Sequence, residues 1–111
     1  MPFRDPKARL RDISESIDLI QQFVHGMKLS DYLSDAKAQA AVERKLMLLS
    51  QAANRLGPDA EALCPKVPWN GIRGMSKWLQ HQYDRVNPEA VWNTVVDDLP
   101  PLRAAVEKAL S

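Results

Sequence analysis

Hydrophobic residues recur at every third or fourth position along most of this chain, which is the spacing of an α-helix that buries one side. The first such stretch covers residues 5–26, where Asp5 can cap the helix, Pro6 suits its first position and Gly26 can end it. Its hydrophobic stripe is predicted to enter the core and consists of Leu10, Ile13, Ile17, Ile20 and Val24.

The same spacing continues beyond this helix, and no stretch alternates in the way that is typical of a strand. One helical turn is expected around residues 31–33, and Asp35 can cap a second long helix that the Gly-Pro pair at 57–58 stops. The buried stripe of that helix is predicted to be Val42, Leu46, Leu49, Ala53 and Leu56. The connector 57–68 holds three prolines and has room for a short helix at 59–63.

Two more helices complete the pattern. One is expected over residues 69–83, and Asn87 with Pro88 can begin the last one. A kink is expected near Asp98, because Pro100 and Pro101 interrupt that last helix. The elements together predict an all-α fold, an up-down bundle of four to five helices that forms a single domain over residues 1–111.

Composition narrows the class of protein further. No run of hydrophobic residues is long enough to cross a membrane, and the N-terminus has no apolar segment of a secretory signal, so a cytoplasmic location is expected. Cys64 is the only cysteine, which excludes an intramolecular disulfide. With only two histidines to add to it, we expect no metal site and no cofactor.

The formal net charge of +1 excludes the basicity along the whole chain that many nucleic-acid-binding proteins have. The charge is nevertheless uneven. Four basic residues and one acidic residue lie between Lys66 and Arg85, so this stretch carries +3 while the rest of the chain carries −2. A local patch of this size can hold a few phosphates and no long duplex.

Residues 69–83 carry the candidate chemistry. At about 100° per residue, a helix places the polar residues on one stripe and the hydrophobic residues on the opposite side. The stripe contains Arg73, Lys77, Gln80 and Asp84, with Ser76 beside it and with His81 and Tyr83 on its two borders, while Ile72, Met75, Leu79 and Val86 lie on the far side. One side of the helix can therefore pack while the other does chemistry.

That chemistry fits metal-free cleavage of RNA, which needs a base, an acid and cations around the phosphate. The imidazole of His81 can exchange protons near neutral pH, and Arg73 and Lys77 can neutralise phosphate charge. Simpler interpretations exist for each residue. His81 can be a surface or helix-capping histidine, Arg73 and Lys77 can form a solvated surface, and Tyr83 can pack on the bundle.

The motif also carries a family resemblance. The segment Ile72-Arg73-Gly74-Met75, followed by His81 and Tyr83 and preceded by Pro68-Trp69, resembles the HepT toxins of the HEPN superfamily. The resemblance extends to residues 11–13, 52–56, 91–92 and 98–102. The chain departs from the family at Ser76-Lys77, where an Arg-Asn pair is normal, and at Ser50-Gln51, where Gly-Glu is frequent.

The resemblance implies a helical HEPN-type toxin that cleaves RNA as a homodimer, with two copies of its motif helix at one groove. Catalytic roles then belong to His81, Arg73, Lys77 and Tyr83, and RNA contacts to Arg73, Lys77, Gln80 and Arg85. It also implies a nucleotidyltransferase antitoxin that silences the toxin by adenylylating Tyr83. Ser76 in place of the motif arginine weakens the nuclease interpretation. The alternative is a non-catalytic module that binds nucleic acid or a protein partner.

Overall fold

The computed structural model describes residues 5–81 and 86–111, and within those ranges every regular element is a helix. The elements are α1 (Pro6–Phe23), α2 (Leu29–Leu33), α3 (Ala36–Leu56), α4 (Asp59–Leu63), α5 (Trp69–His81), α6 (Pro88–Asn93), η1 (Thr94–Asp98) and α7 (Leu99–Leu110). The predicted all-α fold is confirmed. None of the described helices is long and apolar enough to cross a membrane.

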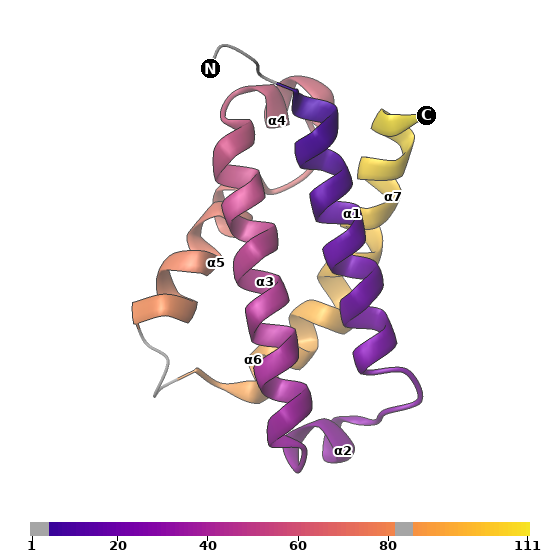
Figure 1. Cartoon of the computed structure of the whole chain (residues 1–111), viewed down its shortest axis with the longest axis vertical. Coiled ribbons are helices and arrows are strands. Elements are labelled where there is room, and N and C mark those ends of the chain that lie inside the picture. The colour runs from indigo at the N-terminus through magenta and orange to yellow at the C-terminus, as the bar shows by residue number, and fades with distance from the viewer. Residues whose placement is uncertain (1–4, 82–85) are drawn as a thin grey trace.

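Helix α3 is the centre of the bundle. It packs against α1 on one side and against α5 on the other, and α7 packs against α1 (Figure 1). The long helices alternate in direction along the chain, which brings the beginning of α1 and the end of α7 to the same end of the molecule. The motif helix α5 is therefore an outer helix that is held mainly by α3.

Local hydrogen bonds explain where the helices begin. A carboxylate oxygen of Asp5 accepts from the backbone N–H of Ala8 at 3.2 Å, and one of Asp35 accepts from that of Ala38 at 2.9 Å. The side chain of Asn87 accepts from the backbone N–H of Glu89 at 2.9 Å. These are the three N-caps that the sequence predicted, and each satisfies a backbone donor that the first helical turn leaves unpaired.

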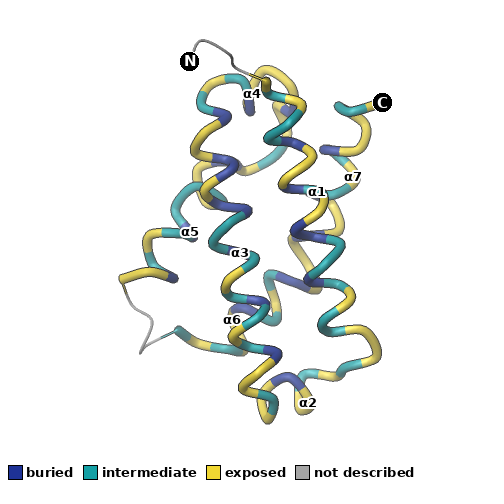
Figure 2. The backbone as a smooth tube through the Cα atoms, viewed as in Figure 1, coloured by how far each residue is buried: buried dark blue, intermediate teal, exposed yellow. Residues whose placement is uncertain are grey.

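The core lies between the facing sides of α1, α3 and α7 (Figure 2). All the predicted stripe residues of α1 and α3 are at most 1% exposed, except Val24. Val24 is only half-buried, because α1 ends one residue earlier, at Phe23. The chain then turns at Gly26, whose φ of +78° lies in the left-handed region that favours glycine.

Two aromatic side chains close the end of the bundle at α2. The rings of Tyr32 on α2 and Trp92 on α6 lie with their centroids 5.3 Å apart and their planes tilted by 36°. Tyr32 is fully buried, and its hydroxyl has no hydrogen-bond partner among the described residues. Burial, and secondarily the charge of Glu43, raise the pKa of this phenol, so Tyr32 stays neutral and acts as a packing residue.

The interruption expected near Asp98 takes the form of a π-helical turn, η1. The backbone N–H of Leu99 donates to the carbonyl oxygen of Thr94, five residues earlier. Pro100 and Pro101 have no N–H, so the ordinary bonds four residues back cannot form at these two positions. The helix therefore widens by one residue before α7 resumes, which is one of the local changes that bend helices.

Candidate functional site on helix α5

Helix α5 has a packed side and an exposed side, as its sequence predicts. Met75 and Leu79 are buried, whereas Lys77, Gln80 and His81 are exposed. Its first residue, Trp69, is 2% exposed and donates its indole N–H to the carbonyl oxygen of Cys64 at 2.9 Å. This bond ties the beginning of α5 to the end of α4, so the exposed side of α5 has a defined direction.

A buried serine of α3 joins the backbone of α5. The hydroxyl of Ser50, which is fully buried, donates to the carbonyl oxygen of Ile72 at 2.6 Å and accepts from the N–H of Ser76 at 2.9 Å. These two backbone groups are four residues apart, so the hydroxyl bridges one turn of α5. Insertion of a side chain into the helical hydrogen-bond ladder is a known cause of helix bending.

An asparagine one turn further along α3 continues this contact. The side-chain amide of Asn54 donates to the carbonyl oxygen of Arg73 at 3.1 Å and to that of Ser50 at the same distance. Polar contacts between two helices are directional, unlike hydrophobic packing, so they set how far α5 is shifted and rotated on α3. Ser50 and Asn54 thereby help to determine where Lys77 and His81 point.

Arg73 is held by contacts with the rest of the protein rather than free on the surface. Its guanidinium forms two hydrogen bonds to the carboxylate of Glu61 on α4, at 2.7 and 2.8 Å, and donates to the carbonyl oxygen of Gly57 at 2.8 Å. Its side chain is only 20% exposed. The hydrogen bond with Arg73 lowers the pKa of Glu61, and the same bond raises the pKa of Arg73.

The ion pair changes the interpretation of the polar stripe. The charge of Arg73 is already balanced by Glu61, and its contacts join α5 to α4 and to the end of α3. The sequence did not suggest this pair, since Glu61 lies twelve residues earlier in an irregular connector. We therefore assign the cationic surface of α5 to Lys77 and treat Arg73 as a residue that holds the helix in place.

We expect Arg73→Ala to lower the free energy of unfolding by about 1 kcal/mol, chiefly through the lost bond to the Gly57 carbonyl, because exposed ion pairs contribute little. The ion pair with Glu61 should contribute a smaller part of this free energy. That part should be present above the ordinary carboxyl pKa of about 4.3 and should disappear as the pH falls through the lowered pKa that Glu61 has in the folded protein. Urea unfolding at several pH values measures both the loss of stability in Arg73→Ala and its dependence on pH. Glu61→Gln is the matched control and should be milder; an unchanged unfolding midpoint in Arg73→Ala would return Arg73 to the phosphate-binding candidates.

The remaining predicted site residues fall into two groups. Lys77, Gln80 and His81 are exposed near the C-terminal end of α5 and make no side-chain hydrogen bond to another described residue. Tyr83 and Arg85 lie outside the described residues. Ser76, at the motif position, is half-buried and its hydroxyl lies 3.4 Å from the carbonyl oxygen of Arg73. Within the described ranges, no three His, Cys, Asp or Glu side chains are grouped to hold a metal ion.

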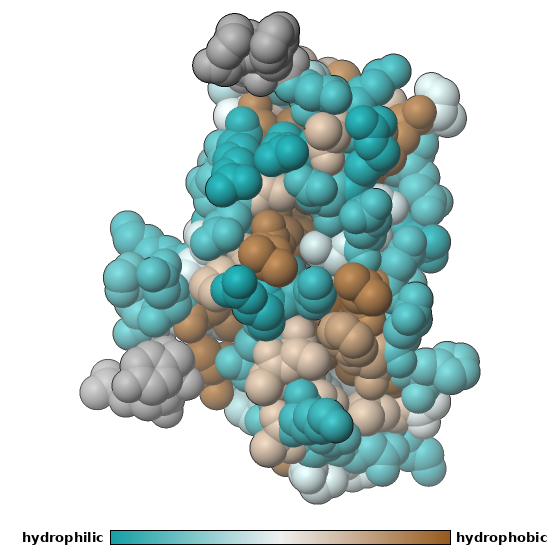
Figure 3. Space-filling view, in the orientation of Figure 1, coloured by the Kyte–Doolittle hydropathy of each residue, from teal (hydrophilic) through white to brown (hydrophobic). Residues whose placement is uncertain are grey.

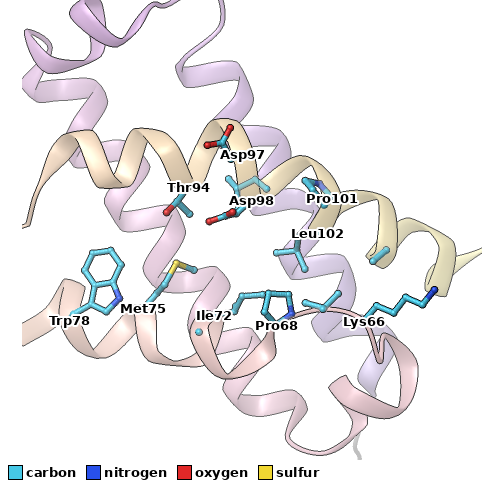
Figure 4. Close-up of a pocket in the computed structure, with 14 residues that line it drawn as sticks. Lys66, Pro68, Ile72, Met75, Trp78, Thr94, Asp97, Asp98, Pro101 and Leu102 are labelled. Carbon is cyan, nitrogen blue, oxygen red and sulfur yellow. The ribbon is translucent and has the colours of Figure 1, made fainter.

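A groove that the sequence did not predict runs along the other side of α5 (Figure 4). It has a volume of about 540 Å³ and lies between α5 and the segment formed by η1 and α7. Hydrophobic periodicity marks Ile72 and Met75 as packing residues, and they do face other helices. Periodicity cannot indicate that the helices stay far enough apart to leave an open groove.

These features indicate what chemistry the exposed side of α5 can perform. An all-helical bundle that exposes a lysine and a histidine one turn apart can bind a phosphate group and transfer protons beside it. The chain belongs to the HepT-like ribonuclease family: the family model described as "Ribonuclease HepT-like" matches residues 13–109.

Similar proteins cover nearly the whole chain. "Probable ribonuclease HepT" of Thermococcus cleftensis is 36% identical over 105 residues, which are 95% of this chain and 96% of that protein. "Putative RNase MJ0127" of Methanocaldococcus jannaschii is 35% identical over 100 residues, which are 90% of this chain and 83% of that protein. No solved structure gives a significant match. The resemblance noted in the sequence is therefore confirmed at the level of the family.

Proposed function

We propose that this protein is an endoribonuclease toxin that works without a metal ion and acts as a homodimer. The observation that supports this most directly is the exposure of Lys77 and His81 on α5 in a chain of the HepT-like ribonuclease family. Gln80 lies between them on the same exposed side and, with Arg85, is proposed to contact RNA.

In the proposed reaction, the imidazole of His81 takes the proton of a ribose 2′-hydroxyl, whose oxygen attacks the adjacent phosphorus. The bond from phosphorus to the 5′-oxygen breaks, and that oxygen takes up a proton as it leaves. Lys77 offsets the charge that accumulates on the phosphate oxygens. One imidazole cannot serve as base and acid in the same step, so His81 of a second copy donates the second proton.

The surface formed by α1 and α3 suits a contact between two copies. A shallow groove there is lined by Leu19 and Leu48 and is bordered by acidic and basic side chains: Asp12, Glu15, Lys45 and Arg55. Hydrophobic side chains are visible among polar ones on this side of the molecule (Figure 3). A two-fold contact places the same patch on both copies, so the acidic residues of one can meet the basic residues of the other.

The dimer implied by the family resemblance brings two copies of the motif helix to one groove, and the contact proposed here would use α1 together with that helix, α5. Since α3 lies between α1 and α5, a contact that uses both of them must extend across α3 (Figure 1). The proposed composite site then lies at the α5 border of this contact, where Lys77 and His81 are exposed.

We expect a dimer in sedimentation equilibrium at micromolar concentration. Leu48→Glu should shift the equilibrium toward the monomer by at least about tenfold, because it places a carboxylate in an apolar contact. The matched control is Leu33→Glu on α2, a leucine that is 42% exposed and lies outside the α1–α3 groove. A wild-type monomer would remove the composite site and the mechanism built on it.

The last part of the proposal is that a modification of Tyr83 switches off the ribonuclease. A nucleotidyltransferase antitoxin is proposed to adenylylate Tyr83, two residues after His81. The added phosphate would bring negative charge and bulk next to a site meant for an RNA phosphate, and both would inhibit cleavage.

Two observations favour a second candidate, a non-catalytic module that binds RNA or a partner protein. Ser76 replaces the arginine of the family motif, and Arg73 is already paired with Glu61. Both leave Lys77 as the exposed cation on the described part of α5. Cleavage of RNA in the presence of EDTA tests the two candidates directly: it supports the endoribonuclease if it depends on His81, and its absence supports the binding module.

A further inference from the structure

We propose that the groove between α5 and the η1–α7 segment binds a guanine base of the RNA strand and thereby sets the base preference of this protein. The proposal rests on the proposed interaction with RNA and names the part of the substrate that this groove would select.

The groove has the size and the walls of a site for a flat ring. Its volume of about 540 Å³ falls in the range of small-molecule sites. Ile72 and Met75 of α5 form one wall, Pro101 and Leu102 form the opposite one, and the indole of Trp78 stands at one end (Figure 4). Apolar walls and an aromatic ring are what proteins use to stack an unpaired RNA base.

The polar side chains that line the groove are few: Lys66 lies in the connector, and Thr94, Asp97 and Asp98 belong to η1. The carboxylate of Asp98 and the hydroxyl of Thr94 point toward the α5 side of the groove, whereas Asp97, which also lines the groove, directs its carboxylate away from α5 (Figure 4). Asp98 is exposed and forms no ion pair with another described residue. Its two oxygens are therefore available to accept hydrogen bonds from a ligand.

A carboxylate facing an apolar wall favours one base over the other three. Guanine presents two N–H donors side by side, at N1 and N2, and both can bond to one carboxylate. Uracil has a single N–H between two carbonyl oxygens, and adenine and cytosine each place a ring acceptor beside their amino group, so the carboxylate repels part of their edge. A good bidentate contact discriminates between bases by roughly 5- to 150-fold.

One end of the groove, at Trp78, comes near the proposed cleavage site. Trp78 precedes His81 by three residues on the same helix, which corresponds to an axial rise of about 4.5 Å. A base stacked on Trp78 is therefore less than one helical turn from the histidine along the axis of α5. Lys66 lies at the opposite end of the groove and can meet a phosphate there (Figure 4). The carboxylates oppose non-specific binding of a polyanion, so base recognition decides which strand stays bound.

The test uses short RNA that cannot be cleaved, so binding is measured apart from catalysis. Fluorescently labelled 2′-O-methyl tetranucleotides of the sequence UUXU, with X as guanine, inosine, adenine, cytosine or uracil, are titrated against wild-type protein by anisotropy. We expect guanine to bind at least about fivefold more tightly than each of the others. Inosine lacks the N2 amino group and should lose most of this preference.

Two neighbouring aspartates provide a matched pair of variants. Asp98→Asn should bring all five tetranucleotides to within about twofold, because an amide offers one acceptor and one donor in place of two acceptors. Asp97→Asn removes the same charge from a lining residue whose carboxylate is directed away from α5, and it should keep the guanine preference. Thermal unfolding of both variants checks that they remain folded.

Equal binding of the five tetranucleotides by wild-type protein, or a guanine preference that survives in Asp98→Asn, would overturn the proposal. Failure to bind any of the five tetranucleotides, as expected if a second copy of the chain covers the groove, would also overturn the proposal. The results also separate this proposal from the ribonuclease itself. RNA cleavage without a guanine preference would leave the enzyme and remove the guanine site, whereas guanine binding without cleavage would support the site in a binding module.

Discussion

His81→Ala is expected to lower the rate of RNA cleavage by at least about 10²-fold, because it removes the group that moves protons in both halves of the proposed step. The imidazole is exposed on α5, so its loss should leave the fold intact. Cleavage of a labelled single strand is followed in EDTA, so that any contribution from a metal-dependent contaminant is suppressed. A loss of rate with unchanged RNA binding would place His81 in the chemical step.

The chain offers a matched control in its other histidine. His25 is exposed in the turn after α1 and belongs to no part of the motif helix. His25→Ala should cleave RNA at the wild-type rate. If His81→Ala and wild type degrade RNA equally, the activity comes from another protein in the preparation and the nuclease assignment fails.

Ser76→Arg combined with Lys77→Asn is expected to raise the cleavage rate by roughly 10²- to 10³-fold, the amount that one preorganised donor at a transition state can contribute. The arginine fork can hold two phosphate oxygens at once, which neither the serine hydroxyl nor a single ammonium can do. Single-turnover cleavage measures the gain in the chemical step. The pair of changes leaves the net charge as it is, so a gain cannot come from added positive charge.

The expected gain in cleavage rate requires that an arginine at position 76 can reach solvent. Ser76 is half-buried, and its N–H donates to the buried hydroxyl of Ser50, so the new side chain must leave along the solvent side of α3. The control Ser76→Lys with Lys77→Asn keeps the charge but replaces the fork with a single ammonium, and it should gain much less. No gain in either variant would favour the binding module, because it would mean that the geometry of a cleavage site is absent.

The helices and the residues at which they begin were determined by the sequence itself. The capping residues Asp5, Asp35 and Asn87 act within three residues of their own position, so their effect can be read locally. The hydrophobic stripes of α1 and α3 were equally clear, because the period of a helix decides which residues share a side. The interruption before Pro100 followed from a missing backbone donor.

The candidate site was only partly predictable. The sequence indicated correctly that Lys77, Gln80 and His81 share the exposed side of α5. It placed Arg73 among them, and only the folded structure shows that Glu61 and the Gly57 carbonyl bind this guanidinium. Both partners belong to the connector, whose position beside α5 no local pattern specifies.

Tertiary structure alone decided three further features. The Ser50 hydroxyl reaches the backbone of a helix more than twenty residues away, the Asp98 carboxylate faces α5 across a groove, and α5 stays on the outside of α3. Helical periodicity identifies which side of each helix is buried. The partner of that side, the spacing between helices and the polar groups that meet across them depend on how the helices are placed relative to one another, and that placement is set by the packing of the whole chain.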